Sequence, residues 1–207
     1  MSIDPGYQKF IVPPPPLASN QEKAEVRVGM VISQLMDIRS DTGSRSCSYI
    51  LCVFSEVGGY FQVQFLLTMK WFETRLRFKN LKDDIKLNTF LPTERDVIWV
   101  PELIFSNTEE KPSTVVDEKT SILVDTTYHA YQTYQLSDKD ENSNIQYFSG
   151  AENPLHLRRF YNQRFLCNYQ LKWYPFDVQK CHLVLEIKES YSPYVKLLIE
   201  SLGSTRG

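Results

Sequence analysis

The clearest alternation of hydrophobic and polar residues runs from Tyr60 to Trp71. The apolar positions are Phe61, Val63, Phe65, Leu67 and Met69, and the positions between them are Gln62, Gln64, Leu66, Thr68 and Lys70. A period of two over this length predicts a strand that packs one face against a core. Leu66 and Thr68 are therefore expected to point away from that core.

Other strand-like segments follow at short intervals. They are 26–38, 97–105, 121–125, 128–136, 155–167 and 182–187. Polar or proline-containing connections, notably 109–113 and 137–144, separate some of them, and no helical stripe of ten or more residues stands out. This pattern favours an all-β sandwich or barrel over an α/β fold.

The N-terminal 25 residues differ from the rest. Pro13 to Pro16 form a short tract that has no backbone donors and is expected to be extended. We expect residues 1–25 to be a stiff lead-in rather than a ligand for a proline-reading domain, and residues 26–207 to be one β domain.

Composition excludes some classes of function. The 23 basic and 25 acidic residues leave a net charge of −2, which argues against nucleic acid as a partner. Aromatic residues make up 13% of the chain and suit a β-rich fold. No apolar run approaches the roughly 18 residues of a spanning helix, and the N-terminus has no signal-peptide pattern.

Four cysteines allow three pairings, among which sequence spacing does not choose. Cys47 and Cys52 lie in a polar excursion, residues 39–56, between the first two strands. Local pairing or free thiols are favoured there over a metal site, because zinc needs about four ligands and no second cluster supplies them. No cofactor or metal is predicted.

The most specific stretch lies between Cys167 and Cys181. It reads CNYQLKWYPFDVQKC, with Tyr174, Pro175, Phe176 and Asp177 at its centre. A disulfide between its ends would close a loop worth about 3 kcal/mol in the chain-entropy model.

This stretch resembles the Cys-loop of the eukaryotic pentameric ligand-gated ion channels. Two further family segments are similar to residues 71–76 (WFETRL) and 99–107 (WVPELIFSN). Glu73 and Glu102 stand where the family has Asp. Residues 150–154 (GAENP) look like invertebrate anion-channel-type members. The matches extend from about residue 26 to about residue 190.

The resemblance implies the Ig-like β-sandwich of the Cys-loop receptor ligand-binding domain. It also implies a place on the extracellular face of the plasma membrane, a pentamer of identical or related subunits, and a small-molecule ligand coupled to channel gating. The Cys167–Cys181 pairing and a coupling role for residues 174–177 follow from the same resemblance. Only 26 residues follow Cys181, so we expect a domain truncated before loop C and the membrane helices, which would supply the membrane contact.

The resemblance also places a ligand site between subunits. The positions that correspond are Leu66, Thr68, Phe105, Ser106, His156, Arg158 and, for loop B, Lys188 or with a small shift Tyr191. A quaternary-ammonium cage needs several aromatic faces, and Leu66 and Ser106 supply none. Arg158 and Lys188 instead suit the carboxylate of an amino acid.

Two other classes of binding protein stay open: a secreted soluble binder of the same fold, and an Ig-like adhesion module, whose cysteines usually lie much farther apart. An enzyme has no support in the sequence. His129, His156 and His182 are far apart, and no nucleophile, phosphate-loop or zinc-protease motif occurs.

Overall fold

The protein is nearly all β in a computed structural model. The structure describes residues 2–3, 6–16, 22–40, 57–108, 114–115, 121–127, 132–135, 144–169, 176 and 178–204. Cys47, Cys52, Tyr174, Pro175 and Asp177 lie outside these residues. Within them, the prediction of an all-β sandwich is confirmed.

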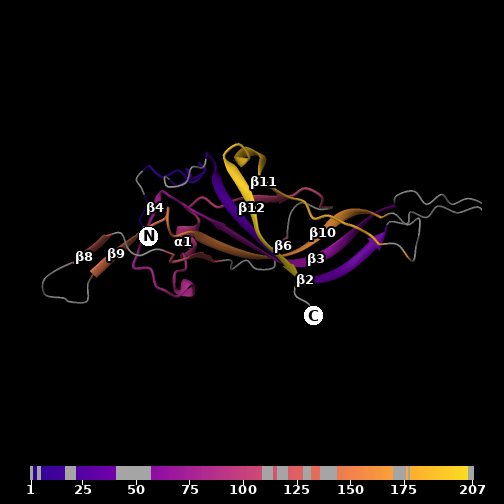
Figure 1. The fold of residues 1–207 in the computed structure, drawn as a ribbon, viewed down its shortest axis with the longest axis horizontal. Coiled ribbons are helices and arrows are strands. Elements are labelled where there is room, and N and C mark those ends of the chain that lie inside the picture. The colour runs from indigo at the N-terminus through magenta and orange to yellow at the C-terminus, as the bar shows by residue number, and fades with distance from the viewer. Residues whose placement is uncertain are drawn as a thin grey trace, which may run out of the picture.

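A six-stranded sheet forms the body of the molecule. Its strands are β12 (Val195–Ser204), β2 (Ala24–Ser40), β3 (Val57–Trp71), β10 (Leu155–Tyr169) and β6 (Thr114–Val115) in that order, with β7 (Ile122–Val124) also pairing with β10. The long strands β2, β3 and β10 are antiparallel neighbours and run side by side along the molecule (Figure 1). Strand β12 pairs with β2 in parallel.

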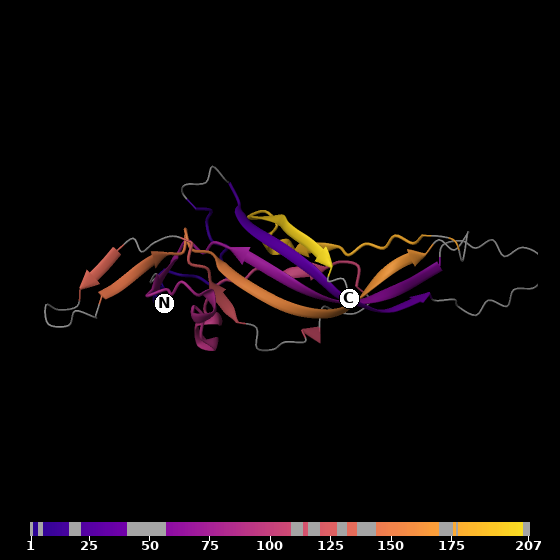
Figure 2. The same cartoon turned by 60° about the horizontal axis from the view of Figure 1, so that its bottom comes forward.

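Two smaller sheets complete the fold. One holds β1 (Ser2–Ile3), β4 (Leu76–Lys79), β9 (Asn144–Ser149) and β8 (Gln132–Gln135), and the other pairs β11 (Leu185–Ile187) with β5 (Leu103–Phe105). Short helical turns are η1 (Ile85–Leu87), α1 (Pro92–Arg95) and η2 (Glu189–Tyr191). The β8–β9 hairpin extends from one end of the molecule in both views (Figures 1 and 2).

An aromatic core joins the six-stranded sheet to the β5–β11 pair. The ring of Phe65 on β3 meets the ring of Phe105 on β5 edge to face at 5.5 Å, and Phe105 also contacts Phe165 of β10 at 5.6 Å. Burying each such side chain contributes about 1.5–3 kcal/mol, and favourable ring pairs add to it. These contacts seat β5 and β11 on the core face of β3 and β10.

The second layer covers only part of that core face. A groove of about 490 Å³ lies beside β11, lined by apolar side chains of β2 and β12 and by Leu183 and Leu185. Ile199 and Leu202 are largely exposed along it. Among the described residues, β5 and β11 thus cover the core face of β3 and β10, whereas the core face of β2 and β12 stays partly uncovered.

The strand predictions for 60–71 and 155–167 are confirmed in β3 and β10. The prediction for 97–105 is wrong over its first six positions: only Leu103–Phe105 forms a strand, and Pro101 before it has no amide hydrogen for a ladder. Strand β12 went unpredicted, because Leu197, Leu198 and Ile199 are consecutive and the register shifts after Ile199, so the period of two is lost.

The disulfide between Cys167 and Cys181 is present, with the two Cα atoms 5.4 Å apart. Phe176, inside the loop it closes, is 92% exposed. No helix among the described residues is long and apolar enough to span a membrane.

Candidate ligand-binding site

The outward face of β3 and β10 brings four of the expected site residues together. Register pairs Thr68 with Arg158, and the neighbouring pairs are Leu66 with Phe160 and Lys70 with His156. Because side chains alternate along a strand, Leu66, Thr68, His156 and Arg158 all project from the face opposite the aromatic core. Residues up to 92 positions apart in the chain therefore form one surface.

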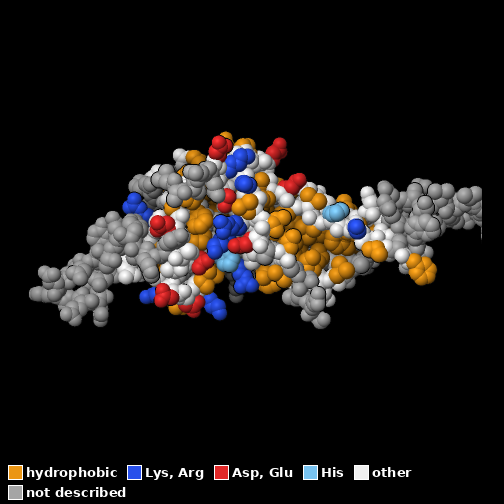
Figure 3. Space-filling model, in the orientation of Figure 1, with side chains coloured by type: hydrophobic (Ala, Val, Ile, Leu, Met, Phe, Trp, Pro, Cys, Tyr) orange, Lys and Arg blue, Asp and Glu red, His pale blue; other side chains and the backbone are white. Residues whose placement is uncertain are grey.

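The cations on this surface differ in their partners. Lys70 Nζ lies 3.0 Å from an Asp125 carboxylate oxygen, and Arg27 lies 3.9 Å from Glu25. Arg158 is exposed and makes no ion pair with any residue that the structure describes. Acidic and basic side chains and a histidine gather at the middle of this face, beside an area of hydrophobic side chains (Figure 3).

His156 is half-buried in this charged group. Burial lowers the pKa of its imidazole below the usual value, and the positive charges of Lys70 and Arg158 lower it further. The carboxylates of Asp125 and Glu200 partly oppose the shift. His156 is accordingly neutral at pH 7 and offers a hydrogen bond rather than a charge.

An apolar row adjoins the charged group. Val31 of β2, Leu66 of β3 and Phe160 of β10 lie opposite one another across three strands, and Phe160 remains substantially exposed. The surface thus combines a free guanidinium with an apolar strip. Phe160 was missed from the sequence, although it lies two residues after Arg158 and shares its face by the period of two.

The β5–β11 pair carries the other expected site residues. Ser106 Oγ donates a hydrogen bond to Glu186 Oε2 at 2.5 Å. Lys188 Nζ donates to Glu102 Oε2, also at 2.5 Å, and this bond raises the pKa of the Lys188 ammonium. Both carboxylates are exposed, so two acidic groups lie beside the residues expected from the sequence.

Tyr191 and Phe105 have different environments. The Tyr191 ring is partly buried, meeting Trp99 edge-on at 5.8 Å and Lys188 Nζ at 5.8 Å from its centroid. Phe105 is 4% exposed in the aromatic core, where it contacts Phe65 and Phe165. We therefore do not propose Phe105 as a ligand contact.

The two groups of residues lie on opposite sides of the six-stranded sheet. Phe65 on the core face of β3 packs against β5, whereas Leu66 and Thr68 face the other way. One chain cannot bring Arg158 and Ser106 to the same ligand. A site using both groups needs two chains.

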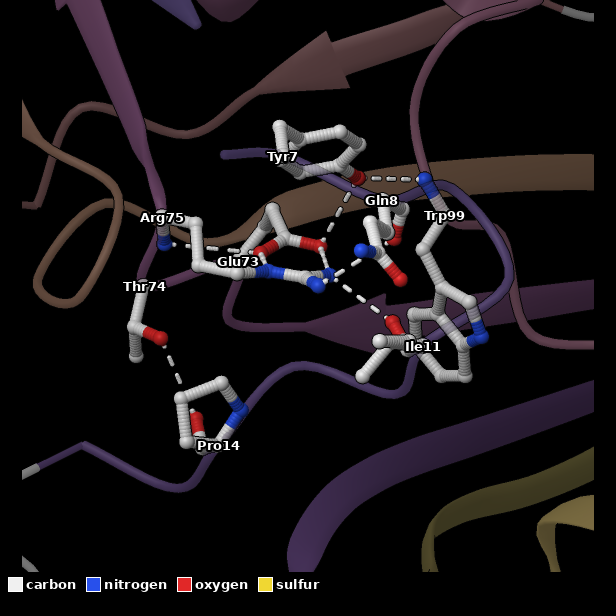
Figure 4. A network of polar contacts seen from close by, with 8 residues as sticks. All are labelled: Tyr7, Gln8, Ile11, Pro14, Glu73, Thr74, Arg75 and Trp99. Atoms are coloured by element: carbon white, nitrogen blue, oxygen red, sulfur yellow. Dashed lines mark hydrogen bonds and ion pairs between the residues drawn. The ribbon is translucent and has the colours of Figure 1, made fainter. Parts of the chain in front are cut away.

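A buried ion pair holds the N-terminal arm, residues 6–16, against the domain (Figure 4). The Glu73 side chain is fully buried, and Arg75 Nε and Nη2 reach its two oxygens at 2.7 and 2.8 Å. Arg75 also donates to the main-chain oxygens of Gln8 and Ile11, and the Tyr7 hydroxyl donates to Glu73 while accepting from Trp99 N–H at 2.6 Å. The arm, the end of β3 and the segment leading to β5 are thus tied together.

The polar groups of this network have shifted pKa values. Burial and the negative charge of Glu73 raise the pKa of the Tyr7 phenol. Burial acts to lower the pKa of Arg75, but the hydrogen bonds and charge of Glu73 outweigh it and raise the pKa. Tyr7 is therefore a neutral donor and Arg75 a permanent cation, as a buried carboxylate requires.

The described residues hold no group of three or more His, Cys, Asp or Glu side chains that could bind a metal ion. The two candidate surfaces are built instead from paired and unpaired charges beside apolar side chains.

Comparison with known proteins identifies a matching family and a similar channel protein. Residues 47–200 match the model of the neurotransmitter-gated ion-channel ligand binding domain, a family of ligand-gated channel domains and not an enzyme class. The chain is also similar to a proton-gated ion channel from Gloeobacter violaceus, 22% identical over 194 residues. That match covers 93% of this chain and 40% of the relative, so the chain spans less than half of the relative's length. The chain belongs to the neurotransmitter-gated ion-channel ligand-binding domain family.

Proposed function

We propose that the chain is the extracellular ligand-binding domain of a pentameric channel subunit, and that a small amino acid binds between neighbouring subunits. One subunit would contribute Leu66, Thr68, His156 and Arg158, and its neighbour Ser106, Lys188 and Tyr191 together with Glu102. The separation of these two groups on opposite sides of one sheet supports a site shared by two chains. The GAENP segment alone supports the narrower placement among invertebrate anion-channel-type subunits.

The unpaired guanidinium of Arg158 is the observation that carries this proposal. Lys70 and Arg27 on the same face already have carboxylate partners, whereas Arg158 has none among the described residues. A guanidinium binds a carboxylate through two parallel hydrogen bonds, which fixes orientation as well as charge. Leu66 and Phe160, one register row away, would contact the carbon skeleton of the ligand.

The neighbouring subunit would meet the ammonium end. Glu102 is exposed and precedes β5, whereas Ser106 follows it, and Lys188 holds the Glu102 carboxylate. We assign Lys188 the role of orienting Glu102 rather than of binding the ligand carboxylate, because its ammonium already has a partner. A zwitterion would thus extend from Arg158 of one chain to Glu102 of the next.

Gating would follow from a shift in population. A ligand that binds one arrangement of the subunit interface better than another favours that arrangement by its difference in affinity. The loop closed by Cys167 and Cys181, with residues 174–177 at its centre, is our proposed coupling element to the membrane segments. Partner subunits would be identical or related chains.

Protons are a second candidate stimulus, because the similar bacterial protein is a proton-gated ion channel. His156 supports this reading within the chain. Its protonation would add a positive charge beside Lys70 and Arg158, and burial together with these two charges already lowers its pKa. The two stimuli separate experimentally, since replacing His156 should abolish a pH response, whereas Glu102→Gln should weaken a response to amino acid at neutral pH and leave the pH response.

Titration calorimetry with γ-aminobutyrate and with glycine tests the main proposal on the oligomeric protein. Arg158→Ala should weaken binding about 10- to 100-fold, since a charge-assisted bidentate contact is lost, and Arg158→Lys should recover part of it. Arg159→Ala is the matched control, because Arg159 is the adjacent arginine on the opposite face of β10. Equal binding by the parent and Arg158→Ala proteins would overturn the proposal.

A further inference from the structure

A second cavity lies between the N-terminal arm and the turn that follows β11. Its volume is about 520 Å³, within the range of small-molecule sites. Residues 10–15 and Glu22 form one side, and Ser190, Tyr191 and Tyr194 form the other. All of these residues belong to one chain, and Tyr191 is the one that the cavity shares with the site proposed between subunits.

Hydrogen bonds hold both walls in place. On the arm, Thr74 Oγ1 donates to the main-chain oxygen of Pro14, and Arg75 donates to that of Ile11 (Figure 4). In the turn, Tyr194 N–H donates to Tyr191 O at 2.9 Å, and Tyr194 O accepts from Ala24 N–H at 2.9 Å. The cavity is therefore formed before any ligand enters, which limits the entropy lost on binding.

Aromatic rings face this cavity with little covering them. Phe10 is 81% exposed and Tyr194 is 63% exposed, while Tyr191 is supported from behind by Trp99. Large exposed rings that line a concavity indicate a binding surface more often than isolated exposed side chains do. Their faces carry partial negative charge and attract cations.

The charge of the cavity has one sign. Among the described residues that line it, Glu22 is the only ionisable one apart from the tyrosines, and it makes no ion pair with any residue the structure describes. Lys188 approaches the Tyr191 ring, but its ammonium is bonded to Glu102. The ring faces and the Glu22 carboxylate together favour a positively charged ligand.

We propose that this cavity binds a small organic cation with an aromatic or apolar body. The charge would lie near Glu22 and the rings of Phe10 and Tyr194, and the body against the prolines of the arm. An occupant would bridge the arm to the turn that carries Tyr191. It would restrain the segment that positions Lys188 without touching Arg158.

Benzyltrimethylammonium is the test probe, and neopentylbenzene is its uncharged isostere. Binding to the full chain is followed by probe NMR and by tryptophan fluorescence, because Trp99 contacts Tyr191. We expect saturable binding of the cation that weakens about ten-fold in Tyr194→Ala and about three-fold in Glu22→Gln, with Tyr194→Phe close to the parent. Phe176→Ala and Glu189→Gln are matched controls, being exposed residues of the same types outside the cavity.

The outcomes separate cleanly. Loss of binding in Tyr194→Ala and Glu22→Gln, with both controls unchanged and far-UV circular dichroism preserved, supports the site. Because Tyr194 and Glu22 are exposed, their replacement should leave the fold intact. Equal binding of neopentylbenzene and the cation, or equal binding by the parent and both cavity variants, overturns the proposal.

Discussion

Arg158 lies directly opposite Thr68 in the antiparallel β3–β10 ladder, with no carboxylate partner among the described residues. Its neighbours on that face are the positive Lys70 and the half-buried His156. A guanidinium that has no ion-pair partner contributes little to folding. The proposed ligand site would give this guanidinium a carboxylate partner.

Replacing Arg158 should therefore leave stability unchanged. We expect Arg158→Ala to alter the free energy of unfolding by no more than about 0.5 kcal/mol, since no ion pair is lost and repulsion from Lys70 is relieved. Urea unfolding measures this directly. A loss above about 1 kcal/mol would reveal a structural role and weaken the case for a ligand.

Stability should fall in mild acid because of His156. Its folded-state pKa is lowered below the unfolded value of about 6.5, so the unfolded chain binds more protons between those two values. The free energy of unfolding therefore decreases as the pH falls from 6.5 through the folded pKa. Comparing urea unfolding at about pH 7.5 and about pH 5 checks the sign.

His156→Gln isolates this contribution. The variant should lose less stability than the parent protein over the same pH interval, because it has no imidazole to protonate. His182→Gln serves as the control, since His182 is exposed and lies outside the Lys70–Asp125–Arg158 group. The same pH dependence in the parent and His156→Gln proteins would refute the assignment.

The buried Glu73–Arg75 pair should be costly to break. Arg75→Met leaves a fully buried carboxylate without its cation, and we expect a loss of about 3–5 kcal/mol measured by chemical unfolding. Arg95→Met is the control, because Arg95 and Asp96 form a looser pair at 3.7 Å nearer the surface. The arm should also become more sensitive to protease in Arg75→Met, as the bonds to Gln8 and Ile11 are lost. Comparable effects of the two variants would contradict this account.

Gly150 is required where the chain leaves β9 beside the turn that joins β3 to β4. A Cβ there would collide with the main-chain oxygen of Glu73 and lie 2.9 Å from that of Leu76. Backbone atoms cannot move aside as a flexible side chain can, so Gly150→Ala should cost about 1–3 kcal/mol in thermal or urea unfolding. Gly6→Ala, where a Cβ meets nothing within 4 Å, should be close to neutral.

The sequence could predict those strands in which apolar and polar residues alternate without interruption. The alternation in β3 identifies which side chains face outward, and this alone groups Leu66 with Thr68. Strand β12 could not be found in this way, because its bulge after Ile199 interrupts the period. A period of two also does not show which strands pair with each other. It is the pairing of β3 with β10 that sets Arg158 beside Thr68.

The polar contacts of the site were less accessible to sequence reasoning. Glu73 and Arg75 stand two residues apart in a recognisable segment, yet Tyr7, which completes their network, is 66 residues from Glu73. Lys188 and Glu102 are 86 residues apart and meet only because β5 and β11 pair. The sequence suggested that Lys188 binds the carboxylate of a ligand. In the structure Lys188 binds the carboxylate of Glu102 in the same chain.

A complementation measurement tests the shared site most directly. Light scattering first identifies particles near five times the 24.2 kDa chain mass. Oligomers of Arg158→Ala alone and of Glu102→Gln alone should each lose γ-aminobutyrate binding. Oligomers assembled from a mixture of the two should recover binding at those interfaces where an intact Arg158 faces an intact Glu102. Absence of binding in the mixture, despite correct assembly and binding by the parent protein, would contradict a site shared between two subunits.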